Sequence, residues 1–299
     1  MGTGAGIVGL RGGRCAEYEV IGDGPALLYF TGGPGENAAI LRKDARLIAD
    51  LFTVYLIEPH GSGGSTPPAD ASAYDAIGHA RFYDEVREAL EIPRASIMGF
   101  SFGASVALAY AGLFPAVATR CVAVAGRAVG ADAGPESDAE MERALALHAS
   151  APWYKEARAA WDQVDERVLS MEDPAELDRM RLEVLPFYMG DPESPTAEAI
   201  LADWRRNLRS NLAASQAWVG GLWEALDLRD LLRLIACPTL VLAGDLDLAC
   251  GPYHARAISA HVPHAAIVTV PKCGHFIPSE RPEEFRSSLV AFCESDAAR

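Results

Sequence analysis

The segment Gly99-Phe100-Ser101-Phe102-Gly103 decides the fold of this chain, because of the residues on either side of it. Residues 95–98 are short and apolar, as in a buried strand, and residues 104–111 are small and apolar, as in a buried helix that ends near Pro115. The serine therefore falls at a strand-to-helix turn, which strains its backbone and exposes its hydroxyl. The flanking glycines suit such a turn, since a Cβ there would collide with neighbouring backbone. The pentapeptide alone also fits an ordinary Gly/Ser turn, so its meaning depends on the rest of the chain.

Composition indicates a globular protein with one large α/β domain and an insertion, or with two ordinary domains. The chain has 299 residues, of which 50% are hydrophobic, enough for a sizeable core. A formal net charge of −15 argues against nucleic-acid binding, which needs a basic face. No apolar stretch approaches the roughly 20 residues of a membrane span, and residues 1–14 do not resemble a signal peptide. The six cysteines are scattered without a Cys-x-x-Cys pair, which indicates neither a disulfide framework nor a zinc site. We expect a cytoplasmic protein.

Strand and helix patterns alternate in the first part of the chain. Strands are expected at 14–21, 26–30, 52–57, 95–98 and 119–125, and helices at 37–50, 74–91 and 104–111. Continuously apolar strands between helices are typical of a mostly parallel sheet that is covered on both faces. The sequence therefore predicts an α/β fold.

The alternation stops at residue 127 and resumes after residue 226. Residues 127–226 are charged and helix-rich, have no recognisable strand and contain all five tryptophans. We predict that they form an inserted helical domain and that residues 1–126 and 227–299 form the core domain. In the last part, helices are expected at 226–236, 252–261 and 282–293, and strands at 238–243 and 265–270.

The chemistry of a serine nucleophile requires two further groups. A base must take the hydroxyl proton, and a carboxylate must orient the base and stabilise its cation. Asp245 and Asp247 directly follow one predicted strand, and His275 follows the next. The chain order serine, aspartate, histidine is that of the α/β-hydrolase arrangement.

With these motifs in place, the chain resembles the α/β-hydrolase fold superfamily over nearly its whole length, with residues 127–226 as a cap. Residues 31–35, Thr-Gly-Gly-Pro-Gly, look like the His-Gly-Gly-Pro-Gly loop of proline iminopeptidases and related cap-bearing hydrolases. Residues 58–65 are similar to their Asp-x-Arg-Gly-x-Gly-x-Ser loop. Thr31 and His60 replace the histidine and the arginine of these loops.

The resemblance implies a role for each matching catalytic residue. Ser101 would be the nucleophile, and His275 would act first as general base and then as general acid. Family spacing from the preceding glycine favours Asp247 over Asp245 as the residue that orients His275.

The resemblance also implies binding residues. The backbone N–H groups of Gly33 and Phe102 would form an oxyanion hole. Iminopeptidases hold a substrate ammonium with cap carboxylates near tryptophans, and Glu224 beside Trp223 is the nearest candidate here. Phe100 is a further candidate for substrate binding. No metal ligand or cofactor site is expected.

We therefore expect a serine hydrolase that cleaves an ester, lactone, thioester or small amide through an acyl-enzyme. Iminopeptidase-like action on an N-terminal residue is the specific subfamily expectation. Two alternatives stay open: a tailoring cyclase, lyase or acyltransferase of natural-product metabolism that uses the same residues, and a non-catalytic relative that binds a small molecule. The expected partner is a small-molecule substrate, with no nucleic acid and no membrane, and a homo-oligomer stays open.

Overall fold

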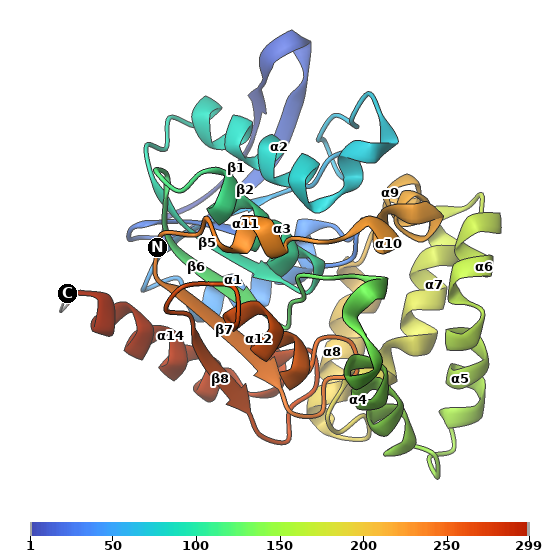
Figure 1. Ribbon diagram of the computed structural model, residues 1–299. Coiled ribbons are helices and arrows are strands. Elements are labelled where there is room, and N and C mark those ends of the chain that lie inside the picture. Colours follow the sequence, from blue (N-terminus) through green and yellow to red (C-terminus); the bar gives the residue numbers. More distant parts are fainter. Residues whose placement is uncertain (1, 298–299) are drawn as a thin grey trace.

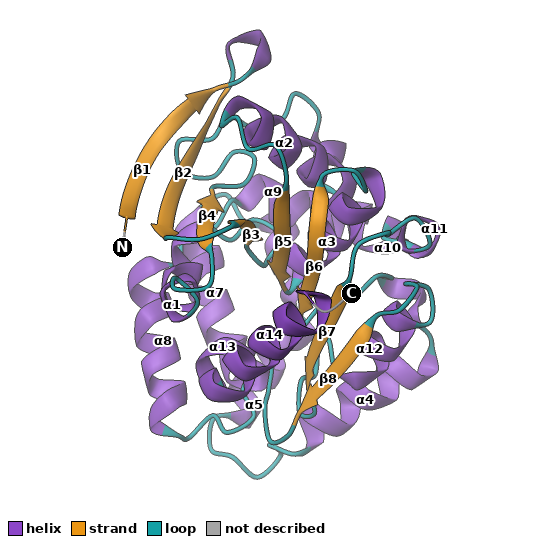
Figure 2. Ribbon diagram, turned by 90° about the vertical axis from the view of Figure 1, so that its left-hand side faces the viewer, coloured by secondary structure: helices purple, strands orange, loops and turns teal. Residues whose placement is uncertain are grey.

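A computed structural model describes residues 2–297, which form an eight-stranded sheet with helices on both faces (Figure 1). Figure 2 shows the strand order, β1-β2-β4-β3-β5-β6-β7-β8. β2 pairs antiparallel with β1 and β4, and all pairs from β4 to β8 are parallel. The strands are β1 (Gly2–Gly9), β2 (Cys15–Gly22), β3 (Ala26–Phe30), β4 (Thr53–Ile57), β5 (Ala95–Phe100), β6 (Ala118–Val124), β7 (Thr239–Gly244) and β8 (Ala266–Val270). The predicted α/β fold with a mostly parallel sheet is confirmed.

Strand β1 is the one strand that the sequence patterns did not predict. It is glycine-rich, yet it pairs with β2 along its whole length, from Gly2 opposite Gly22 to Gly9 opposite Cys15. Because backbone hydrogen bonds make this pairing, the strand needs no alternation of apolar side chains. A search for hydrophobic periodicity therefore gives no signal here.

The helices of the core lie on the two faces of the sheet. One face is covered by α2 (Ala76–Ala89), α3 (Phe102–Leu113), α11 (Arg229–Leu232) and α12 (Pro252–Ser259), and the other by α1 (Arg42–Leu47), α13 (Ile277–Glu280) and α14 (Pro282–Ala297). Successive side chains of a strand point to opposite faces. In β3, Leu28 and Phe30 accordingly join the first buried cluster, and Leu27 and Tyr29 join the second. This two-sided burial explains why β3 is apolar at every position.

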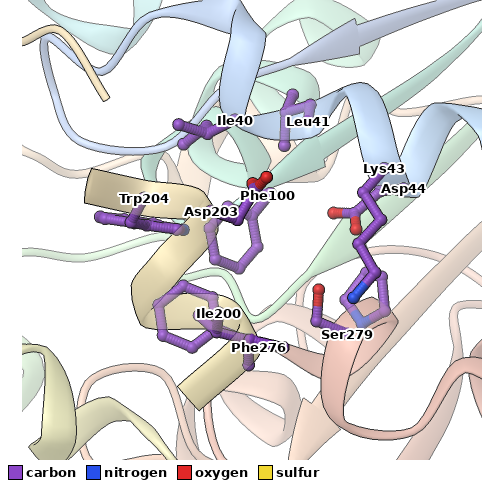
Figure 3. A pocket seen from close by; sticks show the side chains of 12 residues that line it. Ile40, Leu41, Lys43, Asp44, Phe100, Ile200, Asp203, Trp204, Phe276 and Ser279 are labelled. Carbon is purple, nitrogen blue, oxygen red and sulfur yellow. The ribbon is translucent and has the colours of Figure 1, made fainter. Parts of the chain in front are cut away.

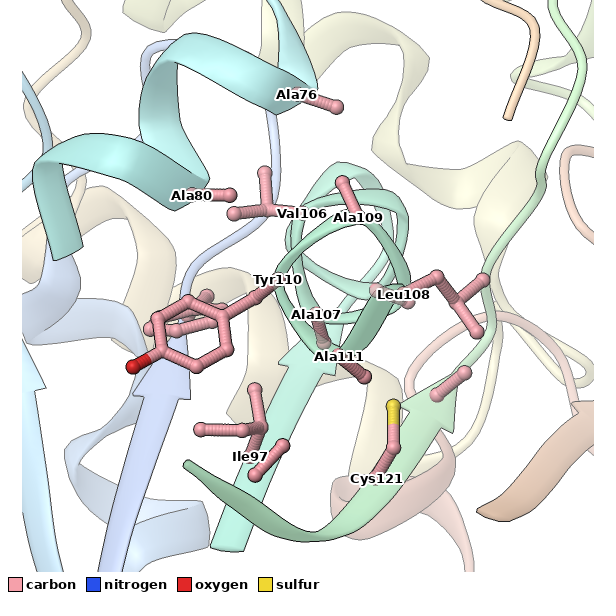
Figure 4. Packing of buried hydrophobic residues seen from close by; sticks show 14 of the residues in the cluster. Ala76, Ala80, Ile97, Val106, Ala107, Leu108, Ala109, Tyr110, Ala111 and Cys121 are labelled. Atoms are coloured by element: carbon pink, nitrogen blue, oxygen red, sulfur yellow. The ribbon is translucent and has the colours of Figure 1, made fainter. Parts of the chain in front are cut away.

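Helix α3 lies deepest in the core. All residues from Phe102 to Gly112 are buried, and the cluster around them includes Ala76 and Ala80 of α2 and Ile97 of β5 (Figure 4). Alanine side chains on both helices allow α2 and α3 to approach closely. The helix that follows Ser101 is thus held on all sides.

Between β6 and β7 the described chain contains helices and no strand (Figure 1). We call residues 127–226 the insert. Its α-helices are α4 (Pro135–Ala146), α5 (Tyr154–Asp162), α6 (Val164–Ser170), α7 (Pro174–Val184), α8 (Pro195–Asn207), α9 (Leu212–Ala217) and α10 (Trp223–Ala225). Among the described residues, no helix is both long enough and apolar enough to cross a membrane.

Shorter helical turns complete the fold. The 3₁₀ turns are η1 (Arg11–Gly13), η2 (Ala38–Leu41), η3 (Ala71–Tyr74), η4 (Ala131–Ala133) and η5 (Leu185–Tyr188), and η6 (Trp218–Leu222) is a π turn. The helix expected at 37–50 is therefore divided into η2 and α1, which ends at Leu47.

The prediction of a helix at 226–236 is wrong in length, since only Arg229–Leu232 is helical. An isolated bridge pairs Asp227 with Val129, and the Leu228 N–H donates to Ala128 O. These contacts hold residues 227 and 228 outside the helix, which begins only after them.

Candidate active site

Ser101 occupies a strained turn between β5 and α3. Its backbone angles are φ 56° and ψ −121°, in a region that residues with a Cβ rarely adopt. A Cβ on Gly99 would lie 1.8 Å from Gly103 O, and a Cβ on Gly103 would lie 2.3 Å from Phe30 O. Both glycines are therefore required by contact with backbone atoms.

The loop at residues 31–35 lies against this turn. A Cβ on Gly32 would lie 3.2 Å from Ser101 Cβ, and one on Gly33 would lie 2.7 Å from Gly35 N. Gly33 has φ 109°, which favours glycine. Phe102 is the first residue of α3, where helix N–H groups have no partner within the helix. The segments that carry the two predicted oxyanion donors thus lie on either side of Ser101.

His275 and Asp247 form a buried pair at the same edge of the sheet. His275 Nδ1 lies 2.7 Å from Asp247 Oδ2, and both side chains are almost fully buried. Asp247 Oδ1 accepts hydrogen bonds from the N–H groups of Ala249 at 2.8 Å and Cys250 at 3.0 Å. Asp245, the other candidate carboxylate, accepts instead from the Cys273 N–H. Of the two, Asp247 is therefore the one that contacts the histidine.

Asp247 is ionised despite its burial. Burial alone would raise its pKa, but the neighbouring His275, together with hydrogen bonds from His275, Cys250 and Ala249, holds the pKa below its ordinary value. A carboxylate in this state fixes the imidazole tautomer with Nε2 unprotonated and stabilises the imidazolium form.

Residues that were not predicted to belong to the site hold the His275 loop. Glu280 accepts hydrogen bonds from the N–H groups of Gly274 and Phe276 on the two sides of His275, and from Gly190 of the insert. The His275 N–H donates to Tyr188 O, and the two rings lie 5.3 Å apart. The only signal in the sequence is the position of Glu280 a few residues after the histidine.

Two more charged groups reach the site without having been predicted. Glu36, which directly follows the glycine-rich loop, is buried beside Gly32. Arg181 of α7 lies 3.2 Å from Glu36 and donates to Pro34 O at 2.7 Å. The insert therefore contacts the loop that carries Gly33 directly.

Trp223 and Glu224, the substrate-binding residues predicted in the insert, do not contact Ser101 or His275 through any hydrogen bond, ion pair or ring contact of the described residues. Trp223 is half-buried under the Arg127 guanidinium, which lies 4.5 Å from its ring, and it contacts Trp218. Trp218 in turn contacts Phe102 at 5.0 Å. Glu224 is exposed, and its charge adds to the effect of burial in raising the pKa of Asp165. The structure therefore links Trp223 to Phe102 through one side chain and places Glu224 at the surface.

Phe100 lines a pocket between the core and the insert. Figure 3 shows the pocket, lined by η2 and α1, by Ile200 and Trp204 of α8, and by Phe276. The Phe100 ring lies 4.9 Å from the His275 ring. The pocket is thus adjacent to the residues that flank Ser101 and His275, although neither of these two lines it.

Comparisons with known proteins agree with this fold. The model of the alpha/beta hydrolase fold family matches residues 25–282. A proline iminopeptidase of Heyndrickxia coagulans is 23% identical over 97% of this chain and 98% of its own length. A pimeloyl-[acyl-carrier protein] methyl ester esterase of Xanthomonas campestris is 28% identical over 87% of this chain and 91% of its own. The structure of an alpha/beta fold family hydrolase from Bacillus anthracis has a TM-score of 0.77 at 17% identity, covering 97% of this chain and 99% of that one. Since the family model spans most of the sequence, this chain belongs to the alpha/beta hydrolase fold family.

Proposed function

We propose that this protein is a serine hydrolase that cleaves an ester or a lactone through an acyl-enzyme on Ser101. The observation that carries the proposal is the buried hydrogen bond between Asp247 and His275, at the sheet edge where Ser101 lies on its strained turn. A buried, ionised aspartate behind a histidine is the arrangement that makes a serine hydroxyl nucleophilic.

In the acylation step, Ser101 Oγ attacks the carbonyl carbon while His275 Nε2 takes the hydroxyl proton. Asp247 stabilises the imidazolium that forms. The oxyanion accepts hydrogen bonds from the Gly33 and Phe102 N–H groups, and donors of this kind contribute ~3 kcal/mol each in the transition state. The tetrahedral intermediate then expels the alkoxide, which takes the proton from His275 and leaves as an alcohol.

Deacylation repeats these steps with water as the nucleophile. His275 takes a proton from the water as its oxygen attacks the acyl carbon. The second tetrahedral intermediate collapses to the carboxylic acid, and Ser101 Oγ regains its proton from His275. The overall reaction consumes one water molecule and needs no group beyond those of the chain.

An ester-type substrate is favoured over an N-terminal peptide. An esterase and an iminopeptidase are both relatives, but the predicted amine anchor Glu224 is exposed rather than buried. We propose that the insert acts as a cap over the Ser101 site, because Arg181 donates to Pro34 O beside Gly33 and Tyr188 O accepts from the His275 N–H.

The test is covalent labelling by a fluorophosphonate probe, read by intact mass. We expect one adduct on the wild-type protein and none on Ser101→Ala or His275→Ala, with circular dichroism confirming that both variants are folded. Ser287→Ala, an exposed serine on α14, is the matched control and should label fully.

Product analysis then separates hydrolysis from the alternatives. Release of the free acid from ester and lactone panels supports the proposal, whereas a ring or a transferred acyl group indicates a cyclase or an acyltransferase. A folded wild-type protein that takes up no probe and turns over no ester contradicts the proposal and favours a ligand-binding role.

A further inference from the structure

The side chain of Glu36 folds back onto the loop beside Ser101. Only 8% of the residue is exposed. A Cβ on Gly32 would lie 2.7 Å from Glu36 Oε2 and 3.2 Å from Ser101 Cβ. Gly32 therefore lies against both the carboxylate and the proposed nucleophile, and its lack of a side chain allows the two to approach each other.

The two carboxylate oxygens of Glu36 have different surroundings. Oε1 lies 3.2 Å from Arg181 Nη1, whereas Oε2 accepts no hydrogen bond from any residue that the structure describes. Arg181 Nη2 is fully engaged, because it donates to Pro34 O at 2.7 Å and to Ser215 Oγ at 3.0 Å. Its Nη1 is buried and, among the described residues, makes no hydrogen bond of good geometry.

A buried acceptor, Glu36 Oε2, and a buried donor, Arg181 Nη1, therefore lie close together without a well-aligned hydrogen bond. A buried polar group that lacks a hydrogen bond costs ~1–3 kcal/mol. The surrounding contacts hold both groups in place: the Glu36 backbone pairs with Ser210, and Arg181 is fixed to Pro34. A ligand that hydrogen-bonds to both groups would recover this free energy.

The charges around the pair indicate the kind of ligand. Burial raises the pKa of Glu36, while Arg181 and His275 lower it and Asp178 raises it further. Because the guanidinium compensates the carboxylate, an ammonium group at Oε2 would meet a positive charge and could offer Arg181 Nη1 no acceptor beyond its ion pair with Oε1. A neutral group that both donates and accepts, such as a hydroxyl or a carboxamide, satisfies both atoms.

We propose that Glu36 and Arg181 form a subsite for a hydroxyl or carboxamide group of the substrate, a few bonds from the carbonyl that Ser101 attacks. This inference rests on the proposed function, because it names the substrate class of the same site. Glu36 accepts a hydrogen bond from the substrate group, and Arg181 donates one to it. The preferred substrates are accordingly hydroxyacyl or carbamoylacyl esters rather than plain or amino-substituted ones.

The test compares methyl butyrate with its 2-hydroxy, 3-hydroxy, 3-carbamoyl and 3-amino derivatives, with acid release measured by chromatography. We expect the wild-type enzyme to favour a hydroxy or carbamoyl ester over methyl butyrate by about 10- to 100-fold in kcat/KM, as for one or two buried hydrogen bonds. In Glu36→Met, this ratio should fall to near one. Glu36→Gln, which keeps an acceptor oxygen, should retain part of it.

Glu183→Gln is the matched control, since Glu183 pairs with Arg167 on the exposed side of α7 and should leave the ratio unchanged. Equal losses for all five esters in Glu36→Met, with a lowered Tm, would mean that Glu36 is only structural and would overturn the subsite. A wild-type preference for the amino ester would overturn it as well.

Fluorophosphonate labelling of each variant distinguishes the two levels of the proposal. If the wild-type protein is labelled but shows no preference in kcat/KM between substituted and plain esters, the subsite is refuted and the proposed serine hydrolase activity is supported. Unlabelled wild-type protein that releases no acid refutes both.

Discussion

At the scale of single residues, the turn at Ser101 depends on two glycines, because neither position has room for a side chain. Ser101 has φ 56°, and the turn around it brings backbone atoms so close to Gly99 and Gly103 that a Cβ fits at neither position. The strain is maintained by burial of β5 and α3 on either side.

Gly99→Ala should prevent folding or destabilise the protein by ~4 kcal/mol or more, the range of severe steric substitutions. The new methyl group would lie 1.8 Å from the carbonyl oxygen of Gly103, and neither backbone can move without opening the turn. Yield of soluble protein and thermal unfolding measure the effect. Gly4→Ala in β1, where a Cβ meets nothing within 4 Å, is the control. A Gly99→Ala protein with the wild-type Tm would contradict this explanation of the turn.

Asp247→Asn should lower kcat on a hydrolysed ester by ~10³- to 10⁴-fold, as expected when the histidine loses its orienting carboxylate. The amide keeps the size of the side chain, so circular dichroism should stay unchanged. Asp245→Asn serves as the matched control, because Asp245 accepts from the Cys273 N–H rather than from His275. Equal losses in the two variants would show that the 2.7 Å contact between Asp247 and His275 is not what activates the serine.

At the scale of elements, the loop after β4 shows how a departure from the family pattern is accommodated. His60, in place of an arginine, is buried and packs against Phe82 of α2, with 4.0 Å between the ring centroids. Its Nε2 lies 3.4 Å from Gly78 O, and its backbone oxygen accepts from Asn211 of the insert. His60 therefore packs the loop onto α2.

This packing predicts a sensitivity to acid. Burial, with a contribution from His79, lowers the pKa of His60 to about 3. Between about pH 6.5 and pH 3, this histidine is protonated in the unfolded chain, where its pKa is about 6.5, but stays neutral in the folded chain. The free energy of unfolding therefore falls as pH decreases through this range. His60→Phe should reduce the loss of unfolding free energy between pH 7.5 and pH 4.5 by about 3 kcal/mol. Urea unfolding at the two pH values is the measurement.

The control for this prediction is the exposed His264, replaced by Asn because its φ is 62°. It should leave the pH dependence unchanged. An identical loss of stability in His60→Phe and in the wild-type protein would show that His60 is not responsible for the sensitivity.

At the scale of the whole molecule, the insert contacts the proposed site from two sides. Arg181 and Asn211 bind the loops that follow β3 and β4, and Tyr188 and Gly190 bind the loop that holds His275. The insert therefore contacts the loops that hold the proposed catalytic residues.

Glu280→Ala should affect both the fold and the reaction. It removes the acceptor for N–H groups of Gly190, Gly274 and Phe276, and each buried group left without a partner costs ~1–3 kcal/mol. We expect a lower Tm and a fall in kcat that exceeds the change in KM, since the His275 loop loses its support. Glu284→Ala, exposed on α14, is the control. A destabilised variant with unchanged kcat would show that Glu280 supports the fold alone.

Much of the fold could be predicted because its signals are local. The two-sided burial of β3, β5, β6 and β7 makes their sequences predominantly apolar, and the capping Asp75 begins α2 close to its expected start. The prediction failed where pairing between distant segments decides the structure. β1 has no apolar pattern, and α11 is short because Asp227 and Leu228 bind residues near position 128.

The sequence by itself determined the architecture and the chain order of a serine, an aspartate and a histidine at strand ends, because hydrophobic periodicity and the steric needs of glycine act over a few neighbouring residues. Only the tertiary structure decided that Asp247 rather than Asp245 contacts His275, and that Glu36 and Arg181 meet beside Gly32. These contacts join residues far apart in the chain. Their geometry follows from how the sheet, its loops and the insert pack together, which no short stretch of sequence encodes.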